Sequence, residues 1–335
     1  MIKRFINGGD MATIKQIATE MGVSVATVSN AMTGKGRVSS DMAERIRNYA
    51  NEIGYRPSLV GRALRGGQTG ILGLVMPDLT NPLFPRIAQH LSLVADSRQL
   101  GILIADSRGN ADEQRQAIDR LVDRGVDGLL IVPQKGTSPG PQQVPTVIIN
   151  TSSDPDNAVS ADHAGGGKLI AAHIAGLGHR RVVILGGDPV SEVQRDRIDG
   201  MRAGFPDARE IQVFWGEQGL AQLIPAVNEG ATAIMTTSDL LALRAHSHLA
   251  RAGLSVPGDV SLTGFDDLPL ATAMHPMLTT VAQDVAQIAE RAIGQLSRTI
   301  GGVPAPDAGV TVPMRLVPRH STANQKQTTN LEVSQ

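Results

Sequence analysis

The chain has 335 residues and 41% hydrophobic residues, enough for a large core and for two or three domains of typical size. It has no cysteine, which excludes disulfides and thiolate metal sites, and it has no run of 18 apolar residues that would predict a membrane span. The net charge is −1 but uneven, because residues 1–70 carry ten Lys and Arg against five Asp and Glu. A basic N-terminal part on an acidic remainder is typical of a protein whose N-terminal part alone meets phosphate.

Residues 1–10 precede Met11 and fit no element, so we expect an upstream start or a disordered arm there. The stretch lacks the long apolar region of a secretory signal peptide. Together with the lack of cysteine, this favours a cytoplasmic, nucleoid-associated protein.

Residues 13–32, TIKQIATEMGVSVATVSNAM, have the spacing of a helix-turn-helix. Ala18 is small enough for a second helix to cross closely, Gly22 can adopt a left-handed turn conformation, and Val28 points back into a shared core. Ser24 is a suitable N-cap for the second helix. The alternative is an ordinary helical hairpin. The exposed face of the second helix is predicted to carry Val25, Ala26, Thr27, Ser29 and Asn30.

A third helix is predicted over 40–53 from an apolar stripe at helical spacing, with Gly54 after its end. The basic segment 55–67 follows, with a helix start signal at Pro57–Ser58 and a glycine stop. These three helices are small for independent stability but adequate as a head.

From Gly70 onward, short apolar runs alternate with helical patterns. Such runs are typical of strands buried on both faces of a parallel sheet. We therefore predict an α/β core of doubly wound parallel sheets, divided into two lobes because one open sheet rarely holds so many strands. Strands are expected over 71–77, 101–106, 127–133, 145–150, 181–185, 211–215, 231–235 and 259–265. Helices are expected over 83–98, 111–124, 164–177, 195–204, 219–228, 238–252 and 283–299.

Eight motifs follow one another along the chain. They are IKQIATEMGVSVATVSNAM (14–32), GYRPSLVGRALRGGQTG (54–70), LGLVMPDLTNPLF (72–84), DHAGGGKLIAAHIAGLGHRRVVIL (162–185), RDRIDG (195–200), TTSDLLALRAH (236–246), VSLTGFDD (260–267) and LTTVAQD (278–284). In this order and spacing they resemble the LacI/GalR, or lactose-repressor type, family of bacterial transcription regulators. The resemblance covers about Thr13 to Arg319. It implies an N-terminal three-helix DNA-binding head, a hinge helix, and a two-lobed core like a periplasmic sugar-binding protein.

The resemblance also implies domain boundaries. The helix-turn-helix domain would cover 11–57, the hinge helix and linker 58–69, and the effector-binding core 70–320, followed by a disordered tail over 321–335. The chain would cross between lobes near Leu177–His179, Gln283 and Pro313. Lobe one would then be about 70–177 and 284–313, and lobe two about 178–282 and 314–320.

By the same resemblance, Val25, Ala26 and Asn30 occupy the base-reading positions of the second helix. Val25 and Ala26 offer apolar contact, for instance to a thymine methyl group. Asn30 either pairs with adenine through two hydrogen bonds, worth about 1–3 kcal/mol of discrimination, or contacts a phosphate. Further candidates for DNA contact are Thr13, Ser24, Thr27, Ser29, Arg37 and Ser39, with Lys35 as added charge.

Leu64 matches the hinge leucine that wedges between base steps in the minor groove, although it could instead pack against its dimer mate. Ser58 and Gly61 stand in the hinge where Asn and Ala are frequent. Because glycine costs a helix interior about 1 kcal/mol relative to Ala, we expect a hinge that folds only on an operator.

By the same resemblance, Asp162 and Asp266 match the carboxylates that face ligand hydroxyls in the family's effector cleft between the lobes. Arg197 matches the guanidinium of that cleft. A carboxylate accepts hydroxyl protons, and a guanidinium supplies forked donors. Phe84 would form an apolar wall, and Ser238, followed by a matching Asp239, stands where relatives often have Asn.

Trp215, the one tryptophan in the chain, either stacks on a sugar face or belongs to the core at a strand end. With aromatics at 2%, a sugar, a sugar derivative or a nucleoside all remain open as the effector.

The implied partners are double-stranded operator DNA, the small-molecule effector and a second copy of the chain, with no membrane. Dimer contacts are expected from helices that include 83–98 and 283–299. By preferring one arrangement of the lobes, the effector would change the spacing of the two hinge helices of the dimer. An effector that separates these helices would be an inducer, and one that prefers the other arrangement would be a corepressor. We expect no cofactor, no metal site, no catalytic residue and no enzymatic activity. The alternatives are a periplasmic-type solute receptor, which would lack the head, and an enzyme on a doubly wound fold, for which we find no catalytic constellation.

Overall fold

The computed structural model describes residues 12–33, 36–55, 67–205, 210–304 and 309–325. By their contacts these residues fall into two units, a head up to Thr69 and a core from Gly70 onward. Ser58, Leu64 and most of the expected hinge helix lie outside the described residues, as do residues 1–10.

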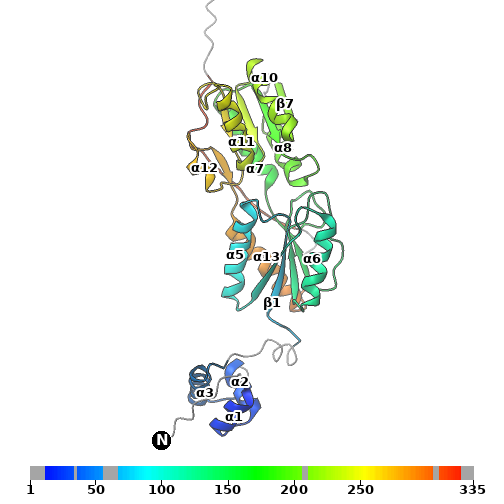
Figure 1. The fold of residues 1–335 in the computed structure, drawn as a ribbon, viewed down its shortest axis with the longest axis vertical. Helices are drawn as coiled ribbons and strands as arrows, with labels where there is room; N and C mark the ends of the chain where they lie inside the picture. The colour runs from blue at the N-terminus through cyan, green and yellow to red at the C-terminus, as the bar shows by residue number, and fades with distance from the viewer. Residues whose placement is uncertain (1–11, 34–35, 56–66, 206–209, 305–308, 326–335) are drawn as a thin grey trace, which may run out of the picture. The chain divides into compact units, whose positions relative to one another are not determined.

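The head consists of three helices packed around one small core (Figure 1). Gly22 ends the first helix with φ of 67°, and Ser24 Oγ accepts a hydrogen bond of 3.0 Å from the amide of Thr27 in the second helix. Ala18 and Val28 are both buried where the first two helices meet. The predicted helix-turn-helix is therefore confirmed. Its helices are α1 (Ile14–Met21), α2 (Val25–Thr33) and α3 (Ser40–Glu52).

The core has two lobes, each built on a four-stranded parallel sheet, with strand orders β2-β1-β3-β4 and β7-β6-β8-β9. Helices cover both faces of each sheet, as Figure 1 shows for α5 and α6 around β1. The elements of lobe one are β1 (Ile71–Met76), α5 (Leu83–Ser97), β2 (Gly101–Asp106), α6 (Ala111–Asp123), β3 (Gly128–Ile131), β4 (Thr146–Ile148), β5 (Val159–Ala161), α13 (Val285–Ile300) and β11 (Val310–Val312). Those of lobe two are α7 (His163–Gly176), β6 (Arg181–Gly186), α8 (Glu192–Ala203), β7 (Glu210–Trp215), α9 (Gly216–Ala221), α10 (Leu223–Asn228), β8 (Ala233–Thr236), α11 (Asp239–Arg251), β9 (Ser261–Thr263), α12 (Leu270–Ala273), β10 (Thr280–Ala282) and β12 (Arg315–Val317).

The buried faces explain this layering. In lobe one, α5 and α13 cover one face of the sheet with a single apolar cluster, and α6 covers the other. In lobe two, α7 and α8 cover one face and α10 and α11 the other. Central strands buried on both sides read as unbroken apolar runs, which is why the sequence located them correctly.

The first crossing between the lobes was predicted wrongly. We expected it near Leu177–His179, but the chain crosses at Asp162, between β5 and α7. Helix α7 belongs to lobe two, because Ile170 and Ile174 lie in one apolar cluster with β6. Residues 163–177 therefore move from lobe one to lobe two. The later crossings lie between β10 and α13 and between β11 and β12.

The tail was also predicted to begin too early. Ser321 is buried, its Oγ donates to the carbonyl of Leu262 at 2.6 Å, and it accepts from the amide of Thr279 at 2.8 Å. The amide of Gln325 donates to the carbonyl of Leu177 at 2.9 Å. Residues 321–325 are thus part of lobe two, held by hydroxyl and backbone bonds that leave no apolar pattern in the sequence.

The strands missed by the sequence analysis are β5, β10, β11 and β12, each three residues long. Runs this short carry no readable periodicity. The helix expected over 219–228 is two short helices, α9 and α10. None of the helices in the described part of the chain is long and apolar enough to cross a bilayer.

Candidate DNA-binding and effector-binding sites

The exposed surface of α2 is smaller than expected. Val25 is 39% exposed and Ala26 is exposed, whereas Thr27, Ser29 and Asn30 are half-buried. The side chain of Asn30 lies against the loop before α3, where a Cβ added to Gly36 would come within 2.7 Å of its Nδ2. The side chain of Asn30 is therefore directed partly toward the loop before α3 and only partly toward the exposed side of α2.

The hydroxyl groups of the head cap its helices. Thr13 Oγ1 accepts from the amide of Gln16 at 3.3 Å, and Ser39 Oγ accepts from that of Met42 at 3.4 Å. Ser24 and Thr27 share a hydrogen bond of 2.9 Å between their hydroxyls. Thr13, Ser24 and Ser39 therefore lie at helix N-termini. The backbone N–H groups of a helix N-terminus can bind an anion such as a DNA phosphate.

The exposed Arg37 adds charge to the loop before α3. Arg47, which the sequence analysis missed, ties α3 to α2 through a 3.1 Å bond from Nε to the carbonyl of Ala31. The bond fixes the second helix on the third.

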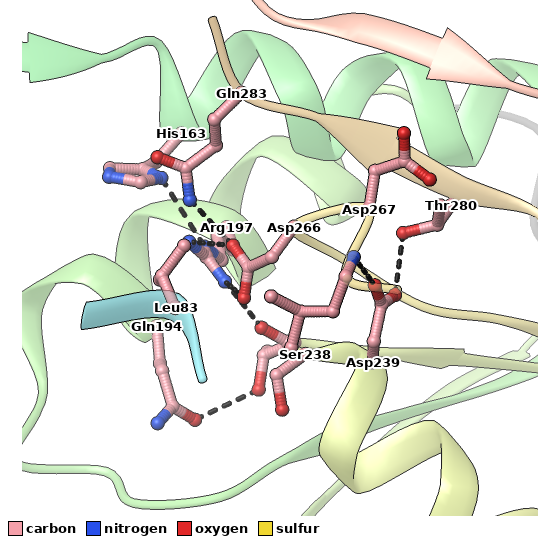
Figure 2. Close-up of polar contacts among 12 residues, drawn as sticks. Leu83, His163, Gln194, Arg197, Ser238, Asp239, Asp266, Asp267, Thr280 and Gln283 are labelled. Carbon is pink, nitrogen blue, oxygen red and sulfur yellow. Dashed lines mark hydrogen bonds and ion pairs between the residues drawn. The ribbon is translucent and has the colours of Figure 1, made fainter. Parts of the chain in front are cut away.

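In the core, Arg197 and Asp266 form a buried ion pair (Figure 2). Nη2 of Arg197 lies 2.8 Å from Oδ1 of Asp266, and both side chains are 4% exposed. Arg197 also donates from Nη1 to the carbonyl of Thr237 at 2.6 Å and lies 4.0 Å from the centre of the Phe265 ring. Gln283 donates from Nε2 to the same Asp266 oxygen at 2.6 Å. Two of the six residues expected to bind the effector are thus brought together and held from several sides.

His163 completes the arrangement from the start of α7. Its Nδ1 accepts a 3.3 Å hydrogen bond from Nε of Arg197, which requires a neutral ring. Burial, and then the positive charge of Arg197, hold the pKa of His163 well below its usual range. The imidazole therefore acts as a neutral acceptor that orients the guanidinium.

Gln194 links two loops next to this pair. Its Oε1 accepts from the amide of Gly187 at 2.6 Å and from Oγ1 of Thr237 at 2.9 Å. The sequence analysis missed Gln194, Gln283 and His163 as site residues. Their types carry no signal, and only the fold places them next to Arg197.

Asp162 and Ser238 occupy helix N-termini. Asp162 Oδ1 accepts from the amide of Gly165 at 2.8 Å and caps α7. Ser238 Oγ accepts from the amide of Leu241 at 3.2 Å and caps α11. Asp239 is turned away from the ion pair, accepting 2.6 Å and 2.7 Å bonds from Oγ1 of Thr280 and from the amide of Leu268.

The two expected aromatic walls are half-buried. Phe84 packs against the core of lobe one. Trp215 ends β7 and packs in lobe two with Ile198, over the space where Gly186 lacks a side chain. Both retain some exposed surface, and Trp215 is at the carboxyl end of its strand, the edge where α/β folds bind ligands.

A cavity of about 460 Å³ opens between the lobes, lined by loops of lobe one around Ser138 and Asp154 and by the outer face of α8. Hydrogen bonds cross between the lobes beside it, from Thr151 to Asp196 and from Asn150 Nδ2 to Glu192 at 3.4 Å. A larger cavity of about 950 Å³ lies on lobe one. The linings of both cavities include none of the expected effector residues. In the part of the chain that the structure describes, no cluster of His, Cys, Asp and Glu is arranged to hold a metal ion.

Comparisons with known proteins agree with this geometry. Residues 13–58 match the model of bacterial regulatory proteins of the lacI family, and residues 171–322 match the periplasmic binding protein-like domain. The HTH-type transcriptional regulator reg1 of Streptomyces lividans is 31% identical over 337 residues, which cover 93% of this chain and 96% of that one. The ribose operon repressor of Haemophilus influenzae is 28% identical, covering 87% of this chain and 92% of that one.

The fold is also that of a solved repressor. A crystal structure of the Lac repressor dimer bound to operator and the anti-inducer ONPF superposes with a TM-score of 0.80 at 24% identity, covering 94% of this chain and 100% of that one. The head, the two-lobed core and the relatives agree along nearly the whole length. The chain therefore belongs to the LacI family of DNA-binding bacterial regulatory proteins.

Proposed function

We propose that this regulator is a repressor that binds a near-palindromic operator as a dimer, and that a sugar-like effector held between its lobes sets its affinity for that operator. The observation that carries the proposal is the buried Arg197–Asp266 pair at the carboxyl ends of the lobe-two strands, in a core attached to a helix-turn-helix. The Lac repressor relative is a dimer bound to operator and an anti-inducer, and another relative is named for the ribose operon.

For DNA, we propose that the eleven head and hinge positions named above make the contacts. Val25 and Ala26 would read bases by apolar contact, because both are exposed on α2. Thr13, Ser24, Thr27, Ser29, Arg37 and Ser39 would contact phosphates, which position the head without reading sequence. Asn30 would have to turn from Gly36 to reach a base, so a phosphate or loop contact suits it better.

For the effector, we propose binding rather than catalysis. Both oxygens of Asp266 already accept hydrogen bonds from fixed donors, so this carboxylate is poorly placed to act as a general acid or base. A hydroxyl-rich ligand can share these donors and acceptors, with Asp162, Ser238, Phe84 and Trp215 around it.

The test begins with selection of a preferred site from random duplex DNA. The full-length protein should prefer a dyad-symmetric duplex over random duplex by about 10³-fold or more at physiological salt. A thermal-shift panel of sugars, sugar derivatives and nucleosides, ribose among them, should then yield a ligand that changes operator affinity by about tenfold, or 1.4 kcal/mol. The direction of that change identifies inducer or corepressor.

Arg197→Lys should keep operator binding and lose the ligand response, because a lysine cannot reproduce the guanidinium fork. Arg244→Lys is the matched control, since Arg244 pairs with Glu217 on the exposed surface of the same lobe. A protein with no preference for any dyad-symmetric site would contradict the proposed function, and equal ligand responses in both variants would contradict the assigned effector site.

A further inference from the structure

The turn after β9 is strained at the carboxylate that the effector site uses. Asp266 has φ of 105° and Asp267 has φ of 51°, both in the left-handed region that favours glycine. Backbone in such a conformation persists when its surroundings hold it there, and it is found at ligand sites. The position of the Asp266 carboxylate therefore depends on what holds this turn.

Lobe two holds the side chains of the turn. Arg197 and Gln283 bind the carboxylate of Asp266, and Nη2 of Arg319 lies 2.6 Å from Oδ1 of Asp267. The amide of Asp266 donates to the carbonyl of Val281 at 2.8 Å. These bonds are made within lobe two and from Gln283, in the crossing between β10 and α13.

Lobe one holds the backbone of the turn through one residue. Nη1 of Arg86, on α5, donates to the carbonyl of Asp267 at 2.8 Å and to that of Asp266 at 3.2 Å. The next residue, Leu268, is 2% exposed and lies in the apolar cluster of lobe one with Leu83 and Ile87, which flank Arg86 on its helix. The strained turn is thus clamped by α5 of the opposite lobe.

Other polar links between the lobes in the described residues differ in kind, and they include a hydrogen bond between the backbone of Asn150 and His163. Lys135 reaches Asp188 at 3.5 Å, and Asn150 and Thr151 reach Glu192 and Asp196. These three links involve α8 and the loop before it; Lys135 is exposed, Thr151 is buried, and Asn150, Asp188, Glu192 and Asp196 are half-buried. Arg86 is distinct in contacting the backbone of the proposed effector carboxylate itself.

We propose that Arg86 is a positioning residue that couples lobe closure to the effector site. With the lobes closed, Arg86 keeps Asp266 and Asp267 in the left-handed conformation and so keeps the Asp266 carboxylate facing the ligand. When the lobes open, α5 withdraws and the turn relaxes. This inference rests on the proposed effector site. It adds the lobe-one residue, Arg86, whose contact with the turn makes the position of the Asp266 carboxylate depend on lobe closure.

The first test is hydrogen exchange on the full-length, ligand-free protein, comparing Arg86→Gln with the wild type. The amides of Asp266 and Leu268 should exchange at least tenfold faster in the variant, whereas the amides of β8 in the same lobe should not change. Arg98→Gln is the matched control, because Arg98 directly follows the same helix and pairs with Glu290 on the surface at 2.7 Å. Arg86→Lys, which can still donate to a carbonyl, should fall between wild type and Arg86→Gln.

The second test measures the lobes directly. Because the chain has no cysteine, spin labels can be attached to cysteines replacing Asp119 on α6 and Ser247 on α11, which are both exposed. Dilution with unlabelled protein isolates the distance within one protomer. Arg86→Gln should add a second, more open population, and Arg98→Gln should not.

Unchanged exchange at Asp266 and Leu268, or the same distance distribution in Arg86→Gln and wild type, would overturn the proposal. A uniform rise in exchange across lobe two would also overturn it, because it would indicate general destabilisation. Neither test uses a sugar or an operator, so failure here is distinct from failure of the operator titration.

Discussion

At the scale of single residues, the core contains an acid held in an unusual environment. Asp239 is fully buried, and its pKa is raised to about 7, first by burial and then by the negative charge of Asp266. Hydrogen bonds from Thr280 and Leu268 oppose the rise but do not cancel it. Between about pH 4 and pH 7 the folded protein therefore binds a proton that the unfolded chain has released. A raised carboxyl pKa makes the folded state less stable, relative to the unfolded state, as the pH rises through this window.

We therefore predict a pH-dependent effect of Asp239→Asn. An asparagine can accept from the amide of Leu268 and donate to Thr280, and it does not titrate. The free energy of unfolding of the variant should rise relative to that of the wild type between about pH 4 and pH 7, by at most about 1.4 kcal/mol per pH unit. Urea unfolding at several pH values measures this difference, and the contribution of His163 cancels in it. Asp119→Asn, at an exposed carboxylate on α6, is the control, and a flat difference for Asp239→Asn would contradict the prediction.

At the scale of elements, glycines bring α7 and α8 close together. A Cβ on Gly200 would overlap the carbonyl oxygen of Ala164, and one on Gly167 would overlap that of Arg197. The two helix backbones therefore meet directly, which places Arg197 of α8 beside His163 of α7. Of the glycines in DHAGGGK, Gly167 faces α8, Gly166 faces Phe265 and Met314, and Gly165 faces the capping carboxylate of Asp162.

Gly200→Ala should separate these helices. We expect a loss of about 1–3 kcal/mol in the free energy of unfolding, as for other overpacked contacts. Gly176→Ala, in the last turn of α7, faces open space and should instead stabilise the protein by about 0.5–1 kcal/mol through helix propensity. Chemical denaturation of both variants checks the pair, and equal effects would show that the close contact has no energetic role.

At the scale of the whole molecule, the head and the core have separate apolar clusters. The head cluster consists of Ile17, Ala18, Val28, Ala31, Ala43, Ile46 and Ala50, a small core for a folded unit. Each lobe has at least one larger cluster, and none of the lobe clusters contains a residue of the head. The core can therefore be expected to fold by itself.

A fragment over 70–335 should melt cooperatively, keep its thermal response to the effector and lose operator binding. Calorimetry and a gel-shift assay with the selected operator measure these properties. A fragment that aggregates or binds the operator like the full-length protein would contradict this division.

Some features follow from the sequence alone, because their causes are local. Gly22, Ser24 and the apolar spacing of α1 define the helix-turn-helix, and unbroken apolar runs locate the central strands of both lobes. The family resemblance singled out Arg197 and Asp266, whose role in effector binding stays a prediction, and nothing in the sequence showed that they pair with one another. Helix spacing and burial on both faces of a sheet leave patterns in consecutive residues, so the sequence alone shows them.

The tertiary structure decided the features that depend on residues distant in sequence. It placed the first lobe crossing at Asp162 rather than near His179, because the glycines of α7 fit against α8. It placed Ser321 against β9, where its hydroxyl donates to the carbonyl of Leu262. It also brought Arg86 to the backbone of Asp267, which lies 181 residues later in the chain. Such contacts arise from packing between elements, and a lone serine, glutamine or arginine carries no pattern that predicts its partner.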